Sequence, residues 1–331
     1  MKKVFLTWMA FFAAIVAANA QQISVVAPGG ATTLYASLDT AITQAAAGST
    51  LYLSGNLSGG GFQVKDETKI TKKLTIIGIG HKPDNDNADG FTIISGNLFF
   101  EGGSGNSALM GVHLSGNVHI GTGEVAVNNF LLRYCNVNSV QIQNSNCQGI
   151  VINQNYIRER SGGGNSAITL TNNVLHSINS VNGGVIDHNI VRYNQYSSYH
   201  NYALLNVSNT QISNNILIDA SNIHSGSECI IRNNMLNADW GDETNGTIKI
   251  VGDWEDVFEG PITGVSPACN YQLKGSQGKG DATDGTDVGI YGGTNFSDAA
   301  LPPIPRIINK KIAEQTDENG KLNIQVYVKA K

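Results

Sequence analysis

A six-residue phrase that recurs in the middle of the chain limits its fold more than any other feature. Every copy starts with Leu or Ile, has a polar residue in second place and ends with an apolar residue. The fourth place is Cys in the first copy and Asn in the other five, and these positions are 20, 18, 16, 26 and 19 residues apart. They are Cys135, Asn155, Asn173, Asn189, Asn215 and Asn234. Such a period indicates a repeat architecture in which each repeat buries its apolar face against the next.

The pattern within each copy indicates which side chains face inward. We expect the apolar first and last residues to face the interior. The polar second residues are expected to face outward, and they are Arg133, Asn153, Thr171, Asp187, Ser213 and Arg232. The Asn is expected to bend the chain between two strands, because its short amide tolerates a left-handed turn. Stacked Asn side chains can then hydrogen-bond amide to amide, which assigns them to the scaffold.

These features predict an all-β fold, a right-handed parallel β-helix solenoid of roughly ten coils. A leucine-rich repeat also stacks Asn residues, but it needs several leucines in a fixed consensus and a constant period, and this chain has neither. Composition agrees with strands joined by tight turns, since the chain has 38 Gly, only 7 Pro and 14% charged residues. Gly tolerates positive φ, and β-branched residues fit the pleat of a sheet.

The two ends of the chain differ from its middle, as expected for an open-ended stack that needs covers. Residues 21–50 are predicted as an N-terminal cap, 51–260 as the β-helix, and 261–331 as an irregular C-terminal cap and tail. Apolar residues at helical spacing predict an amphipathic capping helix over residues 34–46. Gly285 to Gly293 and Leu301 to Pro305 are expected to form the C-terminal cover, and residues 307–331 an added edge strand or a tail.

Residues 1–20 are predicted as a signal peptide. Two lysines precede an apolar stretch from Val4 to Ala18, and Ala18-Asn19-Ala20 provides a small-residue cleavage site. The stretch is short for a membrane-spanning helix of ~20 residues, so we expect no transmembrane segment. The protein is therefore expected to be secreted or periplasmic, including association with the cell surface. A net charge of −5 and a pI of 5.8 give no basis for nucleic-acid binding.

The four cysteines have no zinc-site spacing and lie far apart at Cys135, Cys147, Cys229 and Cys269. Export to an oxidising compartment leaves a disulfide open. Buried free thiols are the preferred interpretation, because Cys135 occupies the core column of the repeat.

Several stretches outside the repeat are distinctive, namely Lys73 to Gly80, Pro83 to Gly90, Gly285 to Gly293, Leu301 to Pro305 and Asn319 to Val328. Together they resemble a group of secreted right-handed parallel β-helix proteins of Bacteroidetes that share the pectin-lyase-like fold. The resemblance covers nearly all of the chain after residue 20, and it lies in scaffold and cap motifs. It implies the fold and secretion, but no particular activity.

One outward stripe carries residues suited to an acidic ligand. Three residues after the repeated Asn, successive coils present Arg158, His176 and Arg192. An aromatic-rich insertion follows directly and contains Tyr193, Tyr196, Tyr199, His200 and Tyr202. Cationic side chains beside aromatic rings make the kind of groove that an acidic glycan needs, although a solvated coil edge has the same composition.

Two kinds of glycan cleavage make different demands on this stripe. A hydrolase needs two or three neighbouring carboxylates, and Asp187 is the only acid among the outward second places of the repeat. A polysaccharide lyase instead needs a base beside the uronate and cations on its carboxylate. His176 or Tyr193 could serve as that base, with Arg158 and Arg192 on the uronate.

Two acidic regions are weaker candidates for calcium. Asp219 and Asp239 are 20 residues apart, near one coil, and could share a Ca²⁺ ion with backbone carbonyls, although loop solvation also explains them. The loop that starts at Asn85 begins like an EF-hand loop, but its twelfth position is Gly96 where a Glu is required, so a turn is expected there. No other cofactor is expected.

The sequence therefore favours an exported, non-catalytic β-helix that binds a polysaccharide or surface glycan, with contacts at the stripe and the insertion. The alternative is a polysaccharide lyase that uses the same side chains for β-elimination on a uronate polysaccharide.

Overall fold

The computed structural model shows an all-β protein. It describes residues 22–55, 60–66, 68–82, 90–192, 202–219, 222–225, 228–236, 245–250, 253–294, 296–297, 301–302 and 306–329. Within these ranges the only helices are α2 (Leu38–Gln44) and α3 (Trp254–Val257). The expected signal peptide and the loop from residue 83 to 89 lie outside the described residues. No helix in the described part of the chain has both the length and the apolar character needed to cross a membrane.

In the described part of the chain, one sheet of 24 strands contains most of the strand residues, and all of its pairings except those of β1 are parallel. Its strands fall into three series, each built of successive parallel pairs. The first series consists of β3 (Ser49–Leu53), β6 (Leu74–Ile77), β9 (Ala108–Met110), β12 (Leu131–Arg133), β15 (Ile150–Asn153), the last parts of β16 (Tyr156–Thr171), β17 (Val174–Asp187) and β19 (Tyr202–Ser213), and β22 (Ile230–Arg232).

The other two series are built in the same way. The second consists of β4 (Phe62–Gln63), β7 (Ile93–Ser95), β10 (His113–Leu114), β13 (Asn136–Val137), the starts of β16 and β17, β18 (Ile190–Arg192), β20 (Ile216–Ile218), β23 (Met235–Leu236) and β24 (Ile248–Lys249). The third consists of β5 (Lys69–Ile70), β8 (Leu98–Phe100), β11 (Val118–Ile120), β14 (Val140–Ile142), the middle parts of β16 and β17, the start of β19, and β21 (Asn222–Ser225).

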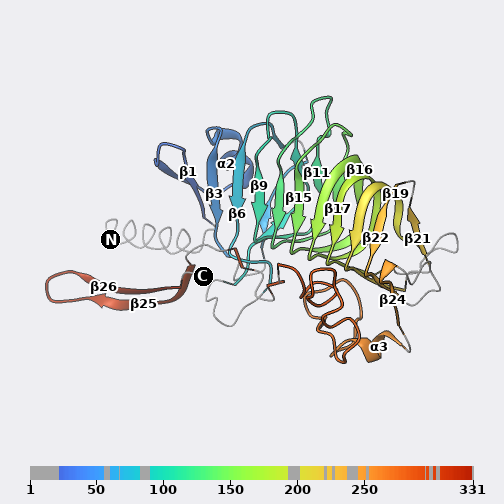
Figure 1. Ribbon diagram of the computed structural model, residues 1–331. Coiled ribbons are helices and arrows are strands. Elements are labelled where there is room, and N and C mark those ends of the chain that lie inside the picture. The colour runs from blue at the N-terminus through green and yellow to red at the C-terminus, as the bar shows by residue number, and fades with distance from the viewer. Residues whose placement is uncertain are drawn as a thin grey trace.

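The chain visits the second, third and first series in turn and then repeats this circuit. Figure 1 shows the resulting stack of circuits, in which each strand lies beside its equivalent from the circuits before and after. β16 and β17 each pass through all three series without a break in strand structure. Residues about one repeat apart in the sequence therefore become direct neighbours in the sheet.

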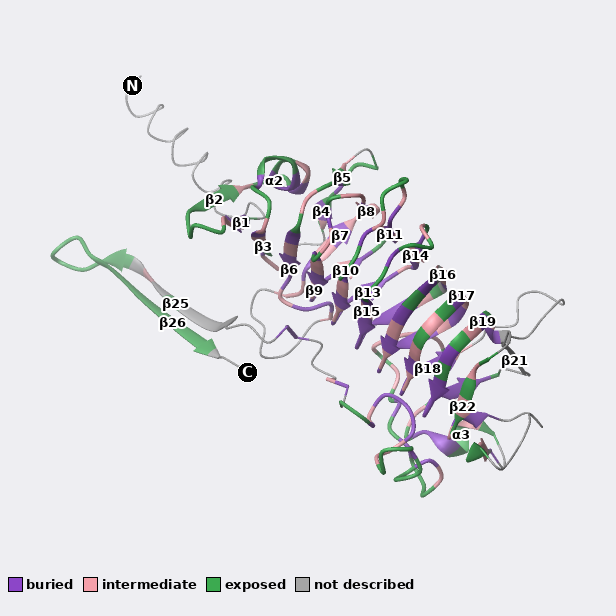
Figure 2. Ribbon diagram, turned by 45° about the horizontal axis from the view of Figure 1, so that its top comes forward, coloured by how far each residue is buried: buried purple, intermediate pink, exposed green. Residues whose placement is uncertain are grey.

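The interior of the stack is apolar along its whole length, as the repeat predicts. The first residue of each phrase is buried in five copies, and Ile231 in the last copy is partly buried against the same core. The last residues are all fully buried, and they are Val137, Ile157, Leu175, Val191, Leu217 and Leu236. Buried positions recur along the stacked strands in Figure 2.

The repeated asparagines form the expected ladder. The side-chain oxygen of Asn173 accepts from both the backbone N and the Nδ2 of Asn155, at 3.0 Å each. Asn189 accepts in the same way from Asn173 at 2.9 and 3.0 Å, and Asn215 from Asn189 at 2.9 and 3.0 Å. Asn234 completes the column by accepting from Asn215 at 3.0 and 2.9 Å. All five side chains are fully buried, so the ladder supplies the partners that buried amides need.

The prediction that the ladder Asn itself takes the left-handed turn conformation is wrong. The residue before it has the positive φ in every copy: Tyr134, Gln154, Asn172, His188, Asn214 and Asn233, with φ between 49° and 59°. This preceding residue turns the chain, and its side chain points away from the core. The ladder Asn is thereby left free to extend its amide along the stack.

The second residues of the phrase face outward as predicted, but two of them are not exposed to solvent. Asn153 is 8% exposed and Ser213 is fully buried. Asn153 Nδ2 donates to Thr171 Oγ1 at 2.9 Å, and Ser213 Oγ donates to Asp187 Oδ1 at 2.7 Å. These positions do lie on the outer side of the sheet, but hydrogen bonds between neighbouring circuits cover their polar atoms.

The N-terminal end is covered by α2 and an antiparallel strand pair. β1 (Ile23–Val26) pairs with β2 (Thr32–Tyr35) and with β3. The expected helix over residues 34–46 is shorter, because Ser37 caps its start by accepting a 3.3 Å hydrogen bond from the backbone N of Thr40. Leu34 lies in β2 and is 61% exposed, whereas the helical apolar residues Leu38, Ala41 and Ile42 are buried as expected.

Residues 253–297, named here the C-terminal segment, lie along the side of the stack. The prediction that residues 285–293 cover the open end of the stack is therefore wrong. The segment packs on an outward apolar column of the second series, made of Tyr156, Val174, Ile190, Ile216 and Met235. A parallel sheet with an apolar outer face requires such a cover.

The C-terminal segment follows the turns of the stack backwards, toward earlier circuits. Asn233 Nδ2 donates to Asp281 O, and Asn214 Nδ2 donates to Thr283 Oγ1. Asn172 Nδ2 donates to the carbonyls of Ile290 and Gly292, and Gln154 accepts from the backbone N of Ser297. The contacts come from the left-handed residues, which explains why these side chains are mostly amides.

The last described residues form a separate hairpin. β25 (Arg306–Thr316) pairs only with β26 (Leu322–Lys329), in antiparallel fashion. Figure 1 shows this hairpin projecting from the stack near its N-terminal end. The expected edge strand is therefore a two-stranded sheet of its own.

All four cysteines are free, and Cys135 and Cys147 are buried. Both findings agree with the buried free thiols that the sequence favours. Cys229 and Cys269 are only partly buried. Burial raises the pKa of the Cys135 thiol to about 12, so this thiol is unreactive.

We predict that Asn189→Leu strongly destabilises the protein. The change removes the acceptor for the backbone N and Nδ2 of Asn173 and the donor to Leu170 O, all buried. Each buried polar group left without a partner costs about 1–3 kcal/mol, so the free energy of unfolding should fall by at least about 3 kcal/mol. Denaturant titration measures the loss. Gln211→Leu, at an exposed outward position of β19, is the control and should change stability little; an equal effect of both variants would contradict the role of the ladder.

Candidate functional site

The stripe proposed from the sequence is present in the structure. The pairings Ile157 with Leu175, Leu175 with Val191, and Arg192 with Ile218 put equivalent positions side by side. Arg158, His176 and Arg192 follow directly and occupy one outward column at the end of the second series. All three side chains are half-buried. The three residues form a row across successive circuits, with neighbouring strands ~4.8 Å apart.

Arg158 is committed to the scaffold. Its Nη1 donates to Asn136 Oδ1 at 2.6 Å, and its Nη2 donates to Leu114 O at 3.1 Å and to Ser115 O at 3.4 Å. The guanidinium therefore reaches back over the two preceding circuits. Burial lowers its pKa, but these acceptors hold the group in place. Arg158 therefore contributes mainly a fixed positive charge beside the stripe.

His176 is neutral at pH 7. Burial lowers its pKa, and the charge of Arg192 acts in the same direction, while Glu159 and a backbone hydrogen bond to Arg192 oppose the shift. A neutral imidazole can accept a proton, which is the property that a general base needs.

Arg192 differs from Arg158, because two of its donor atoms have no acceptor in the described part of the chain. Its Nε and Nη1 are buried and have no hydrogen-bond partner. The loop of the C-terminal segment passes beside it, since a Cβ on Gly264 would lie 3.8 Å from Nη1. Buried donors of a charged group without an acceptor are costly and uncommon. Arg192 is therefore the residue of the stripe whose unpaired donors an anionic group could best satisfy.

Other residues proposed from the sequence are not brought into the stripe by the described structure. Tyr193, Tyr196, Tyr199 and His200 lie outside the described residues, and of Tyr202 only the backbone, at the start of β19, is described. Their part in a groove remains a prediction.

The calcium candidates are likewise untested. Asp219 is exposed in a turn with φ 57°, and Asp239 lies outside the described residues. Across the described ranges no group of three or more His, Cys, Asp or Glu residues is arranged to hold a metal ion.

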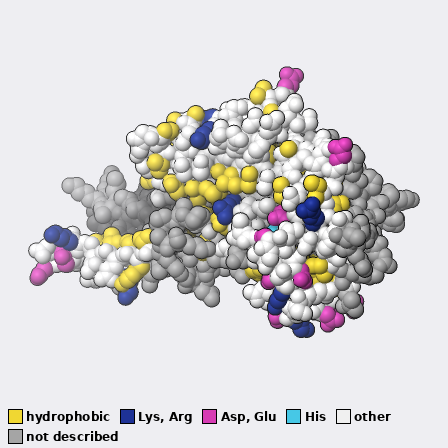
Figure 3. Space-filling view, in the orientation of Figure 1, with side chains coloured by type: hydrophobic (Ala, Val, Ile, Leu, Met, Phe, Trp, Pro, Cys, Tyr) yellow, Lys and Arg dark blue, Asp and Glu magenta, His cyan; other side chains and the backbone are white. Residues whose placement is uncertain are grey.

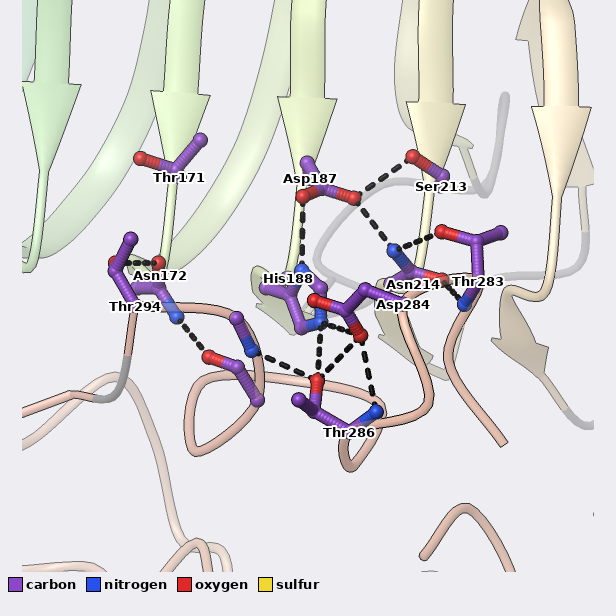
Figure 4. Close-up of polar contacts among 12 residues, drawn as sticks. Thr171, Asn172, Asp187, His188, Ser213, Asn214, Thr283, Asp284, Thr286 and Thr294 are labelled. Atoms are coloured by element: carbon purple, nitrogen blue, oxygen red, sulfur yellow. Dashed lines mark hydrogen bonds and ion pairs between the residues drawn. The ribbon is translucent and has the colours of Figure 1, made fainter. Parts of the chain in front are cut away.

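A second polar cluster, drawn in Figure 4, was not anticipated from the sequence. His188 Nδ1 lies 2.8 Å from Asp187 Oδ2, and its Nε2 lies 3.2 Å from Thr286 Oγ1 and 3.7 Å from Asp284 Oδ1. Asp187 Oδ1 also accepts from Asn214 Nδ2 at 2.8 Å. The repeat shows Asp187 as a lone acid, but its partners Asp284 and Thr286 come from a segment almost 100 residues later.

A carboxylate, an imidazole and a hydroxyl in this order are the parts of an activated nucleophile. Two observations argue against that role. The Thr286 hydroxyl donates to Asp284 Oδ1 at 2.6 Å, and His188 is only 1% exposed. Gly292 closes over the ring, because a Cβ there would lie 2.5 Å from His188 Cδ2. The cluster therefore fastens the C-terminal segment to the stack.

One further hollow lies within the C-terminal segment. It has a volume of about 320 Å³ and is lined by Glu259, Gln272, Leu273, Lys279, Asp287, Val288 and Tyr291. It shares no residue with the stripe. Its mixture of charges indicates no single ligand class.

Comparison with protein-family models, with curated proteins and with solved structures gave no match to this chain. The function is therefore inferred from the geometry of the stripe itself.

Loss of the Thr286 hydroxyl should loosen the C-terminal segment. Thr286→Val keeps the side-chain shape but removes the contacts to His188, Asp284 and the backbone N of Gly293. We expect faster amide hydrogen exchange in residues 281–294, by roughly tenfold or more for a local loss of ~1–3 kcal/mol. Thr169→Val, on the outer face of β16, is the matched control. Unchanged exchange in Thr286→Val would show that the cluster does not hold the segment.

His81 should make the fold sensitive to acid. Its side chain is 2% exposed and packs edge-on against Tyr156 at 5.4 Å, and neither ring nitrogen has a hydrogen-bond partner among the described residues. Burial, followed by the charge of Lys82, lowers its pKa from 6.5 to about 3. The unfolded chain therefore binds a proton at His81 as the pH falls below 6.5, whereas the folded chain binds it only near pH 3. Because the unfolded chain binds more protons in this range, acid favours unfolding.

The predicted effect is a stability that falls by up to about 1.4 kcal/mol per pH unit from this residue as the pH drops below 6.5. His81→Phe should flatten that part of the dependence of unfolding free energy on pH. A residual slope is expected, because burial also lowers the pKa of His113, His119 and His176. An identical slope in the wild type and in His81→Phe would contradict the buried neutral state.

Proposed function

We propose that the chain is an exported right-handed parallel β-helix that binds an acidic glycan without cleaving it. The three parallel series visited in a fixed order support the β-helix, because this is the topology such a solenoid requires. The apolar stretch and cleavage site at residues 1–20 support secretion or a periplasmic location, including association with the cell surface.

The observation that carries the proposed binding function is the unsatisfied guanidinium of Arg192. Its buried Nε and Nη1 lack an acceptor, and a carboxylate or sulfate would supply one in a charge-assisted hydrogen bond.

The rest of the stripe supports a linear ligand rather than a single ion. Arg158 supplies a second, fixed positive charge two circuits before Arg192, and His176 lies between them as a neutral hydrogen-bonding ring. The row crosses successive strands at ~4.8 Å spacing. A polymer with repeated acidic groups can therefore contact more than one circuit.

The alternative function is a polysaccharide lyase that acts on a uronate by β-elimination. The lowered pKa of His176 favours this alternative, because a neutral imidazole can act as the base. The two arginines beside it could bind the carboxylate of the uronate. Tyr193, the other candidate base, lies outside the described residues. Ca²⁺ would be an auxiliary cation in this reaction.

Binding should depend on Arg192 in particular. On an array of polygalacturonate, alginate, heparin and chondroitin, Arg192→Ala should weaken binding by roughly 10- to 100-fold, as expected for a charged hydrogen bond of about 1.5–3 kcal/mol. Arg232→Ala, which removes the same charge from an exposed position on the first series, should leave binding unchanged. Equal loss in both variants would indicate attraction by overall charge, and no loss in Arg192→Ala would remove the stripe as the site.

The lyase alternative has its own readout. β-Elimination leaves an unsaturated uronate that absorbs in the ultraviolet, so product formation can be followed directly on the same four polymers, with and without Ca²⁺. We expect no rise in absorbance. A rise that disappears in His176→Gln while array binding persists would establish the lyase in place of the non-catalytic function.

A further inference from the structure

The hairpin of β25 and β26 presents an apolar face with no cover in the described structure. Side chains at alternate positions of β26 are apolar and about half exposed: Leu322 at 45%, Ile324 at 55%, Val326 at 50% and Val328 at 59%. Cross-strand pairing puts Ile312 opposite Ile324 and Ile307 opposite Val328. Such alternation is typical of a strand with one buried face. The opposite face carries Asn323, Gln325 and Tyr327, and the Tyr327 hydroxyl donates to Gln325 Oε1 at 3.4 Å.

A hairpin of this kind is not expected to stand alone. A two-stranded sheet is only marginally stable in water without further packing. Contiguous exposed apolar surface in a folded protein usually marks an interaction site. The apolar face of the hairpin therefore needs a partner surface.

The outer face of the first series offers a complementary surface. Met110, Leu131 and Val151 are outward, partly exposed residues of β9, β12 and β15, and Tyr52 of β3 is 39% exposed. Pairing of Leu131 with Val151 makes these residues neighbours in adjacent strands. Figure 3 shows hydrophobic side chains gathered in a band on this face, and others along the hairpin. The described part of the C-terminal segment covers the outward column of the second series, and none of these four residues belongs to that contact.

Net charge favours contact between a hairpin and a body over contact between two hairpins. Residues 306–331 contain six Lys or Arg and three Asp or Glu, a net charge of +3. Residues 21–305 contain 13 Lys or Arg and 23 Asp or Glu, a net charge of −10. Two hairpins would repel each other, whereas a hairpin and a body attract. The hairpin projects away from its own stack in Figure 1.

We propose that the chain forms a homodimer in which each hairpin lays its apolar face on the first-series face of the other copy. The exchange is reciprocal, so one twofold axis generates two identical contacts and closes the assembly. Face-to-face packing of the hairpin on a parallel sheet buries the apolar rows of both. The stripe at Arg192 belongs to the second series and remains outside this contact.

The first test is the mass of the full-length chain after removal of residues 1–20, measured by light scattering during gel filtration. The wild type should have the mass of a dimer. Ile324→Asp with Val326→Asp, which charges the apolar face of the hairpin, should halve that mass. Asn323→Asp with Gln325→Asp adds the same charge to the opposite face of the same strand and should leave the dimer intact. A monomeric wild type, or equal effects of the two double variants, would overturn the proposal.

The second test identifies which surface the hairpin contacts. Tyr52→Asp and Val151→Asp each alter the first-series face and should each give monomers whose melting temperatures show that they remain folded; Tyr52, the more exposed, is the variant to use if Val151→Asp unfolds. Mixing the hairpin double variant with a face variant should restore a mixed dimer, since one hairpin and one intact face remain to form a single contact. A face variant that stays dimeric, or failure of the mixture to associate, would overturn the proposal in favour of contact between two hairpins.

Discussion

The hydrogen-bonded column from Asn155 to Asn234 fixes the register on which the rest of the structure depends. The three middle residues of the ladder, Asn173, Asn189 and Asn215, each accept two hydrogen bonds from the circuit before and donate two to the Asn of the circuit after. A shift by one residue would bury unpaired amides and turn apolar side chains outward. The ladder therefore allows circuits of different length to stack, because extra residues leave the column unchanged. Position in the column then determines which side chains share an outward stripe.

The turn before each ladder Asn links the stack to the C-terminal segment. Since the left-handed residue directs its side chain outward, successive turns present a row of amide and imidazole groups. The C-terminal segment binds this row in reverse order, from Asn233 to Gln154, and covers the apolar column beside it. Among the described residues, the C-terminal segment covers one outer face, the stripe at its border is half-buried, and Tyr52 on the first-series face is 39% exposed. The proposed glycan site and the proposed dimer contact therefore use different surfaces.

Much of this arrangement can be predicted from the sequence, because the repeated phrase shows which residues of successive circuits are equivalent. The ladder, the inward apolar positions and the alignment of Arg158, His176 and Arg192 all follow from spacing alone. The left-handed residue does not, because its place in the phrase holds Tyr, Gln, His or Asn and so carries no constant signal. The path of the C-terminal segment depends on contacts between distant residues, as between Thr286 and His188. The different states of the two arginines also cannot be predicted from the sequence. Arg158 donates to acceptors two circuits away, whereas Nε and Nη1 of Arg192 have no acceptor among the described residues.

The most direct test of the account is a double-mutant cycle on the ladder. Asn189→Ala and Asn215→Ala, made singly and together, measure the coupling between neighbours in the column. Because each loses its partner when the other is changed, the two effects should be non-additive by about 0.5–3 kcal/mol. Asn155→Ala with Asn234→Ala, at the two ends of the Asn column, should be additive within ~0.5 kcal/mol. Additivity for the neighbouring pair as well would contradict a ladder that fixes the register of the stack.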